Sequence, residues 1–149
     1  HDALPISISI SNEHQKEIAL DLVLKLGVKK IGILGLSFKP GTDDLRHSPI
    51  VDIIEKLVGK GYNIKIFAAN IKLQRLIGKN KSYIVEKLPH INSLFCDNLE
   101  ETIDWSEAII LTNKEEFIKN INISMDKTII DLAHYPSLRN YKDYHGLCW

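Results

Sequence analysis

The sequence predicts an α/β fold: a doubly wound, five-stranded parallel sheet in the order 3-2-1-4-5, preceded by an N-terminal helix. Three observations predict it. Short apolar segments alternate along the chain with segments whose apolar residues recur at helical spacing. The segment at residues 30–36 is a short apolar run, which is typical of a parallel strand buried on both faces. A single domain is expected, because 149 residues shared between two cores would leave both small.

Helix and strand signals alternate from residue 11 onward. Ser11 can cap a helix, and Gly27 is a suitable stop for it. Ser48 caps a second helix, and Pro49 stands at its first position, where the missing N–H costs no hydrogen bond. Residues 1–10 are left unassigned, as a disordered N-terminus, and the chain after His134 is expected to be irregular. The expected elements are helix 12–26, strand 30–36, helix 49–59, strand 63–67, helices 71–77 and 81–87, strand 93–96, helix 98–105, strand 108–111, helix 115–121 and strand 127–132.

Composition and charge exclude two classes of protein. The chain contains 19 Lys plus Arg and 19 Asp plus Glu, so its formal net charge is zero. Because nucleic-acid binders usually carry a basic excess, nucleic acid is not an expected partner. No run of about 18 uncharged apolar residues is present, so we expect no membrane span.

The cysteines indicate the cellular compartment of the protein, and the N-terminus indicates whether the chain is a piece of a longer protein. Cys96 and Cys148 are two well-separated cysteines, which make neither a zinc site nor a disulfide framework. No metal site is therefore predicted, and free thiols in a reducing cytoplasm are expected. Residues 1–10 lack the basic start and long apolar region of a signal peptide. The only Met is Met125, which leads us to expect a fragment or a processed piece of a longer protein.

The loop after the first strand, residues 37–47, is where function is expected first. In doubly wound sheets a ligand binds beyond the carboxyl ends of the strands, near the point where the strand order reverses. A dinucleotide fingerprint would need two further glycines after Gly35, and they are missing. No acidic residue follows the second strand, where Phe67 precedes Ala68. This chain should therefore not hold the main site of a dinucleotide.

Charged side chains within this loop leave two interpretations open. Lys39 supplies a compact cation suited to a phosphate or a sugar hydroxyl, and Arg46 a planar fork for phosphate or carboxylate. Asp43 and Asp44 could orient either cation. In the alternative, the loop is a solvated charged segment in which Asp44 pairs with Arg46, at a gain of only about 0–1 kcal/mol.

The same loop carries a motif of high specificity. Residues 38–49 read Phe-Lys-x-x-Thr-x-Asp-x-Arg-x-Ser-Pro, which resembles the signature loop of the C-terminal domain of the UDP-glucose/GDP-mannose dehydrogenase family. The resemblance extends from about Ser11 to Trp149. Within the family, the segments 78–84 and 87–94, and the C-terminal Gly-Leu-Cys-Trp, resemble the GDP-mannose branch more than the UDP-glucose branch.

The resemblance implies an NAD-dependent enzyme that oxidises the C6 hydroxyl of a nucleotide sugar, here GDP-mannose to GDP-mannuronate, with two NAD+. It implies that residues 28–149 form a Rossmann-like C-terminal domain that binds the nucleotide sugar, and that residues 11–27 are a connecting helix from a central region. An N-terminal Rossmann domain of the same enzyme would carry NAD, and the enzyme would assemble as a homo-oligomer. A UDP-glucose-type 6-dehydrogenase domain and a non-catalytic, stand-alone nucleotide-sugar-binding module remain the alternatives.

The resemblance also implies roles for three residues of the loop. Phe38 and Lys39 correspond to the pair that contacts the nucleotide sugar, and Arg46 to the arginine that reaches NAD bound to the other domain. No catalytic residue is expected in this chain, because the family's nucleophilic cysteine lies upstream in a Gly-x-Cys-x-Pro-Lys context that Cys96 and Cys148 lack. The family often has Asp at the position of Ala68, and larger residues at the position of Ala133.

Two further residues stand close to the expected ligand edge. His134 and Tyr135 follow the last predicted strand and could approach the cleft. A histidine satisfied within its loop is the simpler interpretation, since nothing in the spacing marks it as a catalytic acid or base.

Overall fold

In the computed structural model, five parallel strands form one sheet in the order β2-β1-β3-β4-β5. The structure describes residues 4–36, 49–67, 86–88, 90–112, 121–133, 135, 138, 141 and 143–146, with the backbone alone at 4–13 and 92. The strands are β1 (Lys30–Leu34), β2 (Asn63–Phe67), β3 (Ala108–Leu111), β4 (Thr128–Asp131) and β5 (Tyr144–Gly146). The helices are α1 (Leu4–Leu26), α2 (Pro49–Gly59), α4 (Leu99–Trp105) and the 3-10 helix η1 (Ile91–Leu94).

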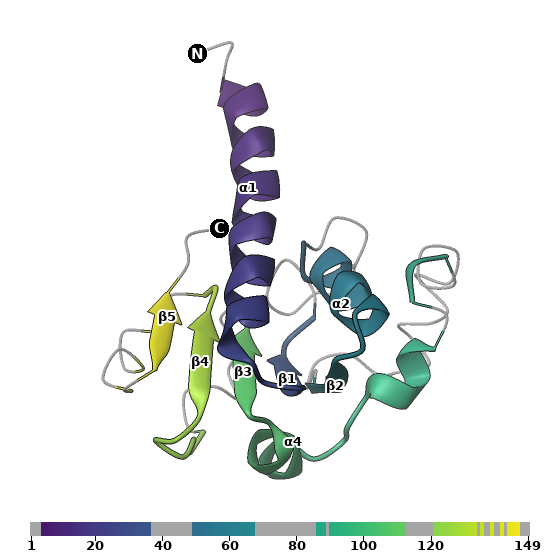
Figure 1. Ribbon diagram of the computed structural model, residues 1–149, viewed down its shortest axis with the longest axis vertical. Helices are drawn as coiled ribbons and strands as arrows, with labels where there is room; N and C mark the ends of the chain where they lie inside the picture. Colours follow the sequence, from purple (N-terminus) through teal and green to yellow (C-terminus); the bar gives the residue numbers. More distant parts are fainter. Residues whose placement is uncertain are drawn as a thin grey trace.

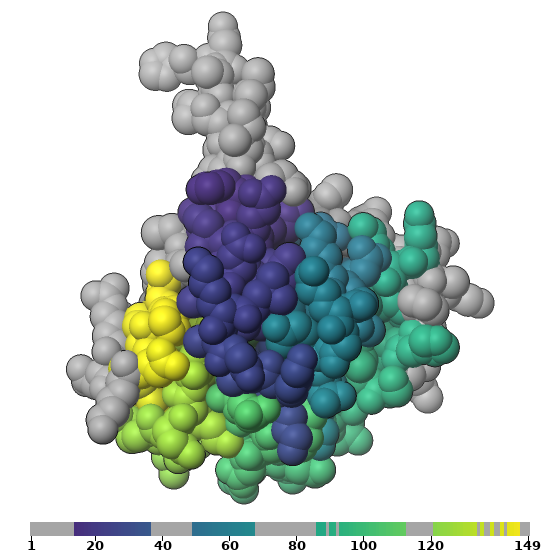
Figure 2. Space-filling model, in the orientation of Figure 1, coloured from purple at the N-terminus to yellow at the C-terminus, as the bar shows by residue number. Residues whose placement is uncertain are grey.

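The sheet separates two apolar clusters, as the continuous apolar runs predict. On one face, α1 and α2 pack against alternate residues of the strands, among them Ile33 and Ile110. On the other face, Ile103 of α4 packs with Leu34 and Ile109. Every residue of β3 and β4 is buried. The predicted doubly wound architecture, with helices on both faces, is therefore confirmed. Figure 1 shows the parallel strands, and Figure 2 shows the face on which α1 lies between α2 and β5.

Local signals in the sequence place several element ends correctly. Pro49 is the first residue of α2, whose predicted apolar face is buried against the sheet. Gly27 ends α1 with φ at 70°, a left-handed conformation that glycine adopts without a steric cost. Asn98 caps α4, because its side-chain oxygen accepts a hydrogen bond from the Glu101 N–H at 2.8 Å.

The predicted strand order is wrong at its third strand. Residues 91–94 form η1, and only Phe95 pairs with the sheet, in a single parallel bridge to Ile66. The physical reason is that Leu88 and Ile91 are drawn into the core, so the chain turns and too little extended backbone remains for a strand. The fifth strand is instead β5, in a segment expected to be irregular. Its Tyr-His-Gly sequence carries no apolar run, and pairing with β4 makes it a strand.

The start of α1 also differs from the prediction. Residues 4–10, predicted to be disordered, form the first turns of this helix, and Figure 1 shows them rising beyond the sheet. The alternation of Ile and Ser over residues 6–11 is not a helical signal. Once a helix has formed, however, each further residue that joins it adds one hydrogen bond. The low helix propensity of Ile and Ser is too weak an effect to stop the helix from extending through these residues. Whether residues 11–27 connect to a central region stays a prediction.

Three predicted helices fall largely outside the described residues. Segment 71–77 lies wholly outside them, and so does 81–87 except for residues 86 and 87, which are helical. The helix predicted at 115–121 is described only at Ile121, which is not helical. Within the described part of the chain, no helix is long and apolar enough to cross a membrane.

Candidate functional site

The point where the strand order reverses lies between β1 and β3, at their carboxyl ends. The chain leaves β1 through buried Gly35, whose φ of 93° belongs to the left-handed region. The Gly35 N–H donates to the Phe67 carbonyl at 2.8 Å, and the Thr112 hydroxyl donates to the Leu34 carbonyl at 3.1 Å. Leu36 then buries its side chain completely. The loop after β1 therefore starts from a rigid base at the site where such sheets bind ligands.

The far end of the same loop enters α2, and ion pairs hold the first turn of that helix. Asp52 of α2 accepts the Lys16 ammonium of α1 at 3.0 Å and the Lys87 ammonium at 3.2 Å. Partial burial acts to raise the pKa of Asp52, but the two lysines outweigh it and lower the pKa below its usual value. Both ends of the loop are thus attached to elements of the core.

The predicted site residues themselves lie outside the described residues. Phe38, Lys39 and Arg46, together with Asp43 and Asp44, belong to segment 37–48, so their predicted roles stay predictions. His134 also lies outside the described residues. Tyr135 is described: its ring packs in the apolar cluster beneath the sheet, and the residue is only 9% exposed. Tyr135 is therefore part of the core, whereas the sequence left open that it approaches the cleft.

A buried carboxylate at this edge of the sheet was missed from the sequence. Asp131, the last residue of β4, is fully buried. One of its oxygens accepts the Ala133 N–H at 2.9 Å, and the other accepts the Tyr135 N–H and the Tyr144 hydroxyl, each at 2.6 Å. Burying a carboxylate costs several kcal/mol, and these charge-assisted hydrogen bonds offset it. The one signal in the sequence is an acidic residue closing an apolar strand.

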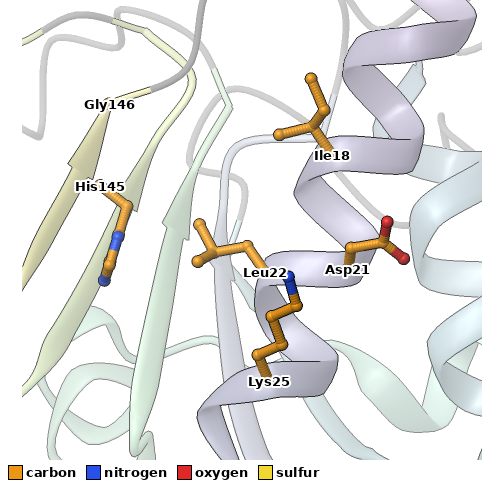
Figure 3. A pocket seen from close by; sticks show the side chains of 6 residues that line it. All are labelled: Ile18, Asp21, Leu22, Lys25, His145 and Gly146. Atoms are coloured by element: carbon orange, nitrogen blue, oxygen red, sulfur yellow. The ribbon is translucent and has the colours of Figure 1, made fainter.

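A cavity of about 350 Å³ lies between α1 and β5. Ile18 and Leu22 supply its apolar wall, and Figure 3 shows His145 opposite them on the strand. Asp21 and Lys25 of α1 lie at the same cavity. Figure 2 shows β5 directly beside α1 on this face of the molecule.

The sequence after β1 and β2 does not fit a dinucleotide. Gly35 stands where a first fingerprint glycine would, but residue 37, where the second glycine would let the backbone approach a pyrophosphate, is a serine, and residue 40 is a proline. The second strand ends at Phe67 without a carboxylate for a ribose. Within the described part of the chain, no group of three or more His, Cys, Asp or Glu side chains could hold a metal ion.

Known proteins resemble this chain over most of its length. The sequence model of the UDP-glucose/GDP-mannose dehydrogenase family, UDP binding domain, matches residues 32–135. GDP-mannose 6-dehydrogenase of Pseudomonas aeruginosa is 40% identical over 145 residues, which cover 96% of this chain and 33% of that protein. UDP-glucose 6-dehydrogenase of Rickettsia bellii is 33% identical over 109 residues, covering 70% of this chain and 23% of that protein.

Solved structures give the same result. The crystal structure of a ternary complex of GDP-mannose dehydrogenase from Pseudomonas aeruginosa matches with a TM-score of 0.84 and 37% identity. The match covers 100% of this chain and 35% of that one. A UDP-glucose dehydrogenase from Pyrobaculum islandicum, 22% identical with a TM-score of 0.77, shares the fold. This chain spans about a third of the length of the curated GDP-mannose 6-dehydrogenases it matches.

Proposed function

This chain belongs to the UDP-glucose/GDP-mannose dehydrogenase family, and on that premise we propose that it is the nucleotide-sugar-binding C-terminal domain of an NAD-dependent GDP-mannose 6-dehydrogenase. The extent of similarity carries the proposal. Almost the whole chain aligns with GDP-mannose 6-dehydrogenases, whereas the match to the Rickettsia bellii UDP-glucose enzyme is shorter and weaker. The proposal assigns the ligand to the carboxyl edge of the sheet, between β1 and β3.

The proposed reaction converts the C6 hydroxymethyl group of GDP-mannose to the carboxylate of GDP-mannuronate, with two NAD+ reduced and one water consumed. We assign the NAD site and the nucleophilic cysteine to a part of the enzyme upstream of this chain. Two observations support that assignment. The sequence after Gly35 lacks the second and third fingerprint glycines, and the half-buried Cys96 thiol, turned toward the Asn98 carbonyl at 3.4 Å, lacks the sequence context of the family nucleophile.

Within this chain, the loop after β1 supplies the proposed contacts. The Lys39 ammonium would pair with a phosphate or sugar hydroxyl of the nucleotide sugar, and Phe38 would pack beside it. The Arg46 guanidinium would reach the anionic NAD held by the N-terminal Rossmann domain. The rigid base of the loop at Gly35 and Leu36 supports this proposal, because such contacts need a fixed starting point. Residues 28–149 would form the binding domain, and α1 would connect it to the central region of a homo-oligomeric enzyme.

A UDP-glucose-type substrate is the second candidate, favoured by the family's own description as a UDP binding domain. The gene upstream of the codon for His1 gives the first test. An upstream frame that encodes Gly-x-Gly-x-x-Gly and Gly-x-Cys-x-Pro-Lys segments is expected. The full-length product should then reduce NAD+ with GDP-mannose and much more slowly with UDP-glucose. The reverse preference would establish the second candidate, and binding without oxidation would indicate a stand-alone binding module.

Substitutions in the full-length enzyme test the residue roles. Lys39→Ala should raise the KM for GDP-mannose about 10- to 100-fold, since a charge-assisted hydrogen bond contributes about 1.5–3 kcal/mol. Arg46→Ala should raise the KM for NAD+ instead. The control is Lys60→Ala, an exposed lysine in the turn after α2, which should change neither. An unchanged KM for GDP-mannose in Lys39→Ala would remove that residue from the proposed site.

A further inference from the structure

We propose that Asp131 is a positioning residue for nucleotide-sugar binding. In this proposal its buried carboxylate holds the backbone of the exit from β4, at residues 132, 133 and 135, beside the edge of the sheet to which the proposed function assigns the ligand. The inference rests on the proposed function, because that function places a nucleotide sugar at this edge. Nothing in it requires Asp131 to touch the ligand.

The hydrogen bonds of Asp131 are arranged to hold a loop. Its carboxylate accepts backbone N–H groups from residues two and four positions further along the chain, Ala133 at 2.9 Å and Tyr135 at 2.6 Å. A single side chain thereby fixes both ends of a short segment. The Tyr144 hydroxyl, from the neighbouring strand β5, donates to the same carboxylate at 2.6 Å. The segment is therefore tied to the edge strand as well as to β4.

The held segment lies on the same edge of the sheet as the loop after β1. Asp131 pairs with Leu111 of β3, and Leu111 pairs with Leu34, the last residue of β1. The Leu132 N–H donates to the Leu111 carbonyl at 2.8 Å, so the chain leaves β4 alongside β3. Two strand spacings, about 10 Å, separate the ends of β1 and β4. A ligand bound over the ends of β1 and β3 would therefore meet residues 132–133 on its β4 side.

A carboxylate at this position is better explained by shape than by stability. The preceding residues of β4, Thr128, Ile129 and Ile130, are buried and mainly apolar. Replacing a buried charge by a well-packed apolar side chain is often neutral or stabilising. An apolar side chain could not accept the Ala133 and Tyr135 N–H groups, however, and the exit from β4 would lose the bonds that select one conformation. The buried carboxylate thus specifies the shape of this edge.

The test uses the full-length enzyme with two variants and one matched control. Asp131→Asn keeps the size of the side chain but turns an amide N–H₂ toward N–H and O–H donors. Tyr144→Phe removes only the hydroxyl donor and leaves the backbone donors of Ala133 and Tyr135 in place. Asp104→Asn makes the same chemical change at an exposed carboxylate of α4. KM for GDP-mannose, KM for NAD+ and kcat are measured for each, together with the melting temperature.

The expected result is a KM effect confined to the nucleotide sugar. Asp131→Asn should raise the KM for GDP-mannose by about tenfold and leave the KM for NAD+ and kcat nearly unchanged, because a ground-state binding surface is altered. Tyr144→Phe should raise the same KM about two- to threefold, and Asp104→Asn should behave as wild type.

Several outcomes would overturn the inference. These are an unchanged KM for GDP-mannose in the folded variants, or a fall in melting temperature with both KM values altered alike, which indicates a purely structural role. If Asp131→Asn does not fold, Tyr144→Phe decides by the same criterion. A wild-type enzyme that oxidises neither GDP-mannose nor UDP-glucose would contradict the proposed function itself, so the two failures are distinguishable.

Discussion

Two of the segments that leave the carboxyl edge of this sheet, after β1 and after β4, are held in different ways. The loop after β1 starts from a glycine with positive φ and an apolar side chain, Leu36, that is buried in the core. The exit from β4 is held by a single buried carboxylate, that of Asp131, which among the described residues accepts hydrogen bonds from Ala133, Tyr135 and Tyr144. The first loop carries its proposed chemistry in its own side chains. The second segment is shaped by hydrogen bonds between its backbone and the Asp131 carboxylate, which is buried inside the protein.

The comparison teaches that a residue with a proposed functional role need not belong to a recognisable sequence motif. Lys39 and Arg46 belong to a motif, so they attract notice without any structure. Asp131 is one acidic residue after three residues of an ordinary strand. Its burial, and the convergence of donors from residues 133, 135 and 144 on its oxygens, exist only once β4 and β5 are paired.

The largest expected effect is a difference in the free energy of unfolding between a variant at Asp131 and a variant at Lys39. Asp131→Ala leaves the Ala133 and Tyr135 N–H groups and the Tyr144 hydroxyl without this acceptor, so the free energy of unfolding should fall by about 3–5 kcal/mol. Lys39→Ala should change it by less than about 0.5 kcal/mol, because the role proposed for Lys39 is to bind the ligand and not to hold the fold. Urea unfolding followed by circular dichroism measures both. Equal losses in the two variants would contradict the distinction between a residue that holds the backbone and a residue that contacts the ligand.

A middle-sized effect concerns the base of the loop after β1. Gly35→Ala places a Cβ on a buried residue with φ at 93°, which should lower the free energy of unfolding by about 1–3 kcal/mol. The matched control is Gly59→Ala, at the end of α2, where an added Cβ meets nothing within 4 Å and φ is not positive. That control should be neutral or slightly stabilising, since alanine has the higher helix propensity. A Gly35→Ala protein as stable as wild type would show that this backbone conformation is not needed.

The smallest expected effect on stability comes from the carboxylate of Asp52, which is partly exposed, in contrast to the buried carboxylate of Asp131. The pKa of Asp52 is lowered in the folded protein, so the unfolded chain binds its proton more readily. The stabilisation from its lysine pairs is therefore complete above about pH 4, near the unfolded pKa, and is lost as the pH falls through the folded pKa. Its size should be at most about 1 kcal/mol, because the pair is partly exposed to solvent.

Comparison of wild type with Lys16→Met measures this contribution. The difference in unfolding free energy between the two proteins should be present at pH 7 and shrink below pH 4. A difference that stays constant down to pH 2 would mean that packing of the Lys16 side chain, and not its charge, carries the effect.

Much of this fold follows from the sequence, and the exceptions have physical causes. Continuous apolar runs predicted β1 and β3, because burial on both faces favours an apolar side chain at each position of a strand. Pro49, Asn98 and Gly27 marked helix ends because the chemistry of capping is local. Residues 93–96 and 144–146 were misassigned, because whether a short segment becomes a strand depends on a neighbour distant in the sequence.

The same division applies to the candidate site. The sequence by itself determined the fold class, the loop that carries the family motif, and the lack of a dinucleotide fingerprint, since each depends on neighbouring residues. Only the tertiary structure decided that Tyr135 is part of the core and that the Asp131 carboxylate holds the exit from β4. The physical reason is that burial and hydrogen-bond partners are properties of the assembled sheet, in which residues 13 positions apart, Asp131 and Tyr144, come within 2.6 Å.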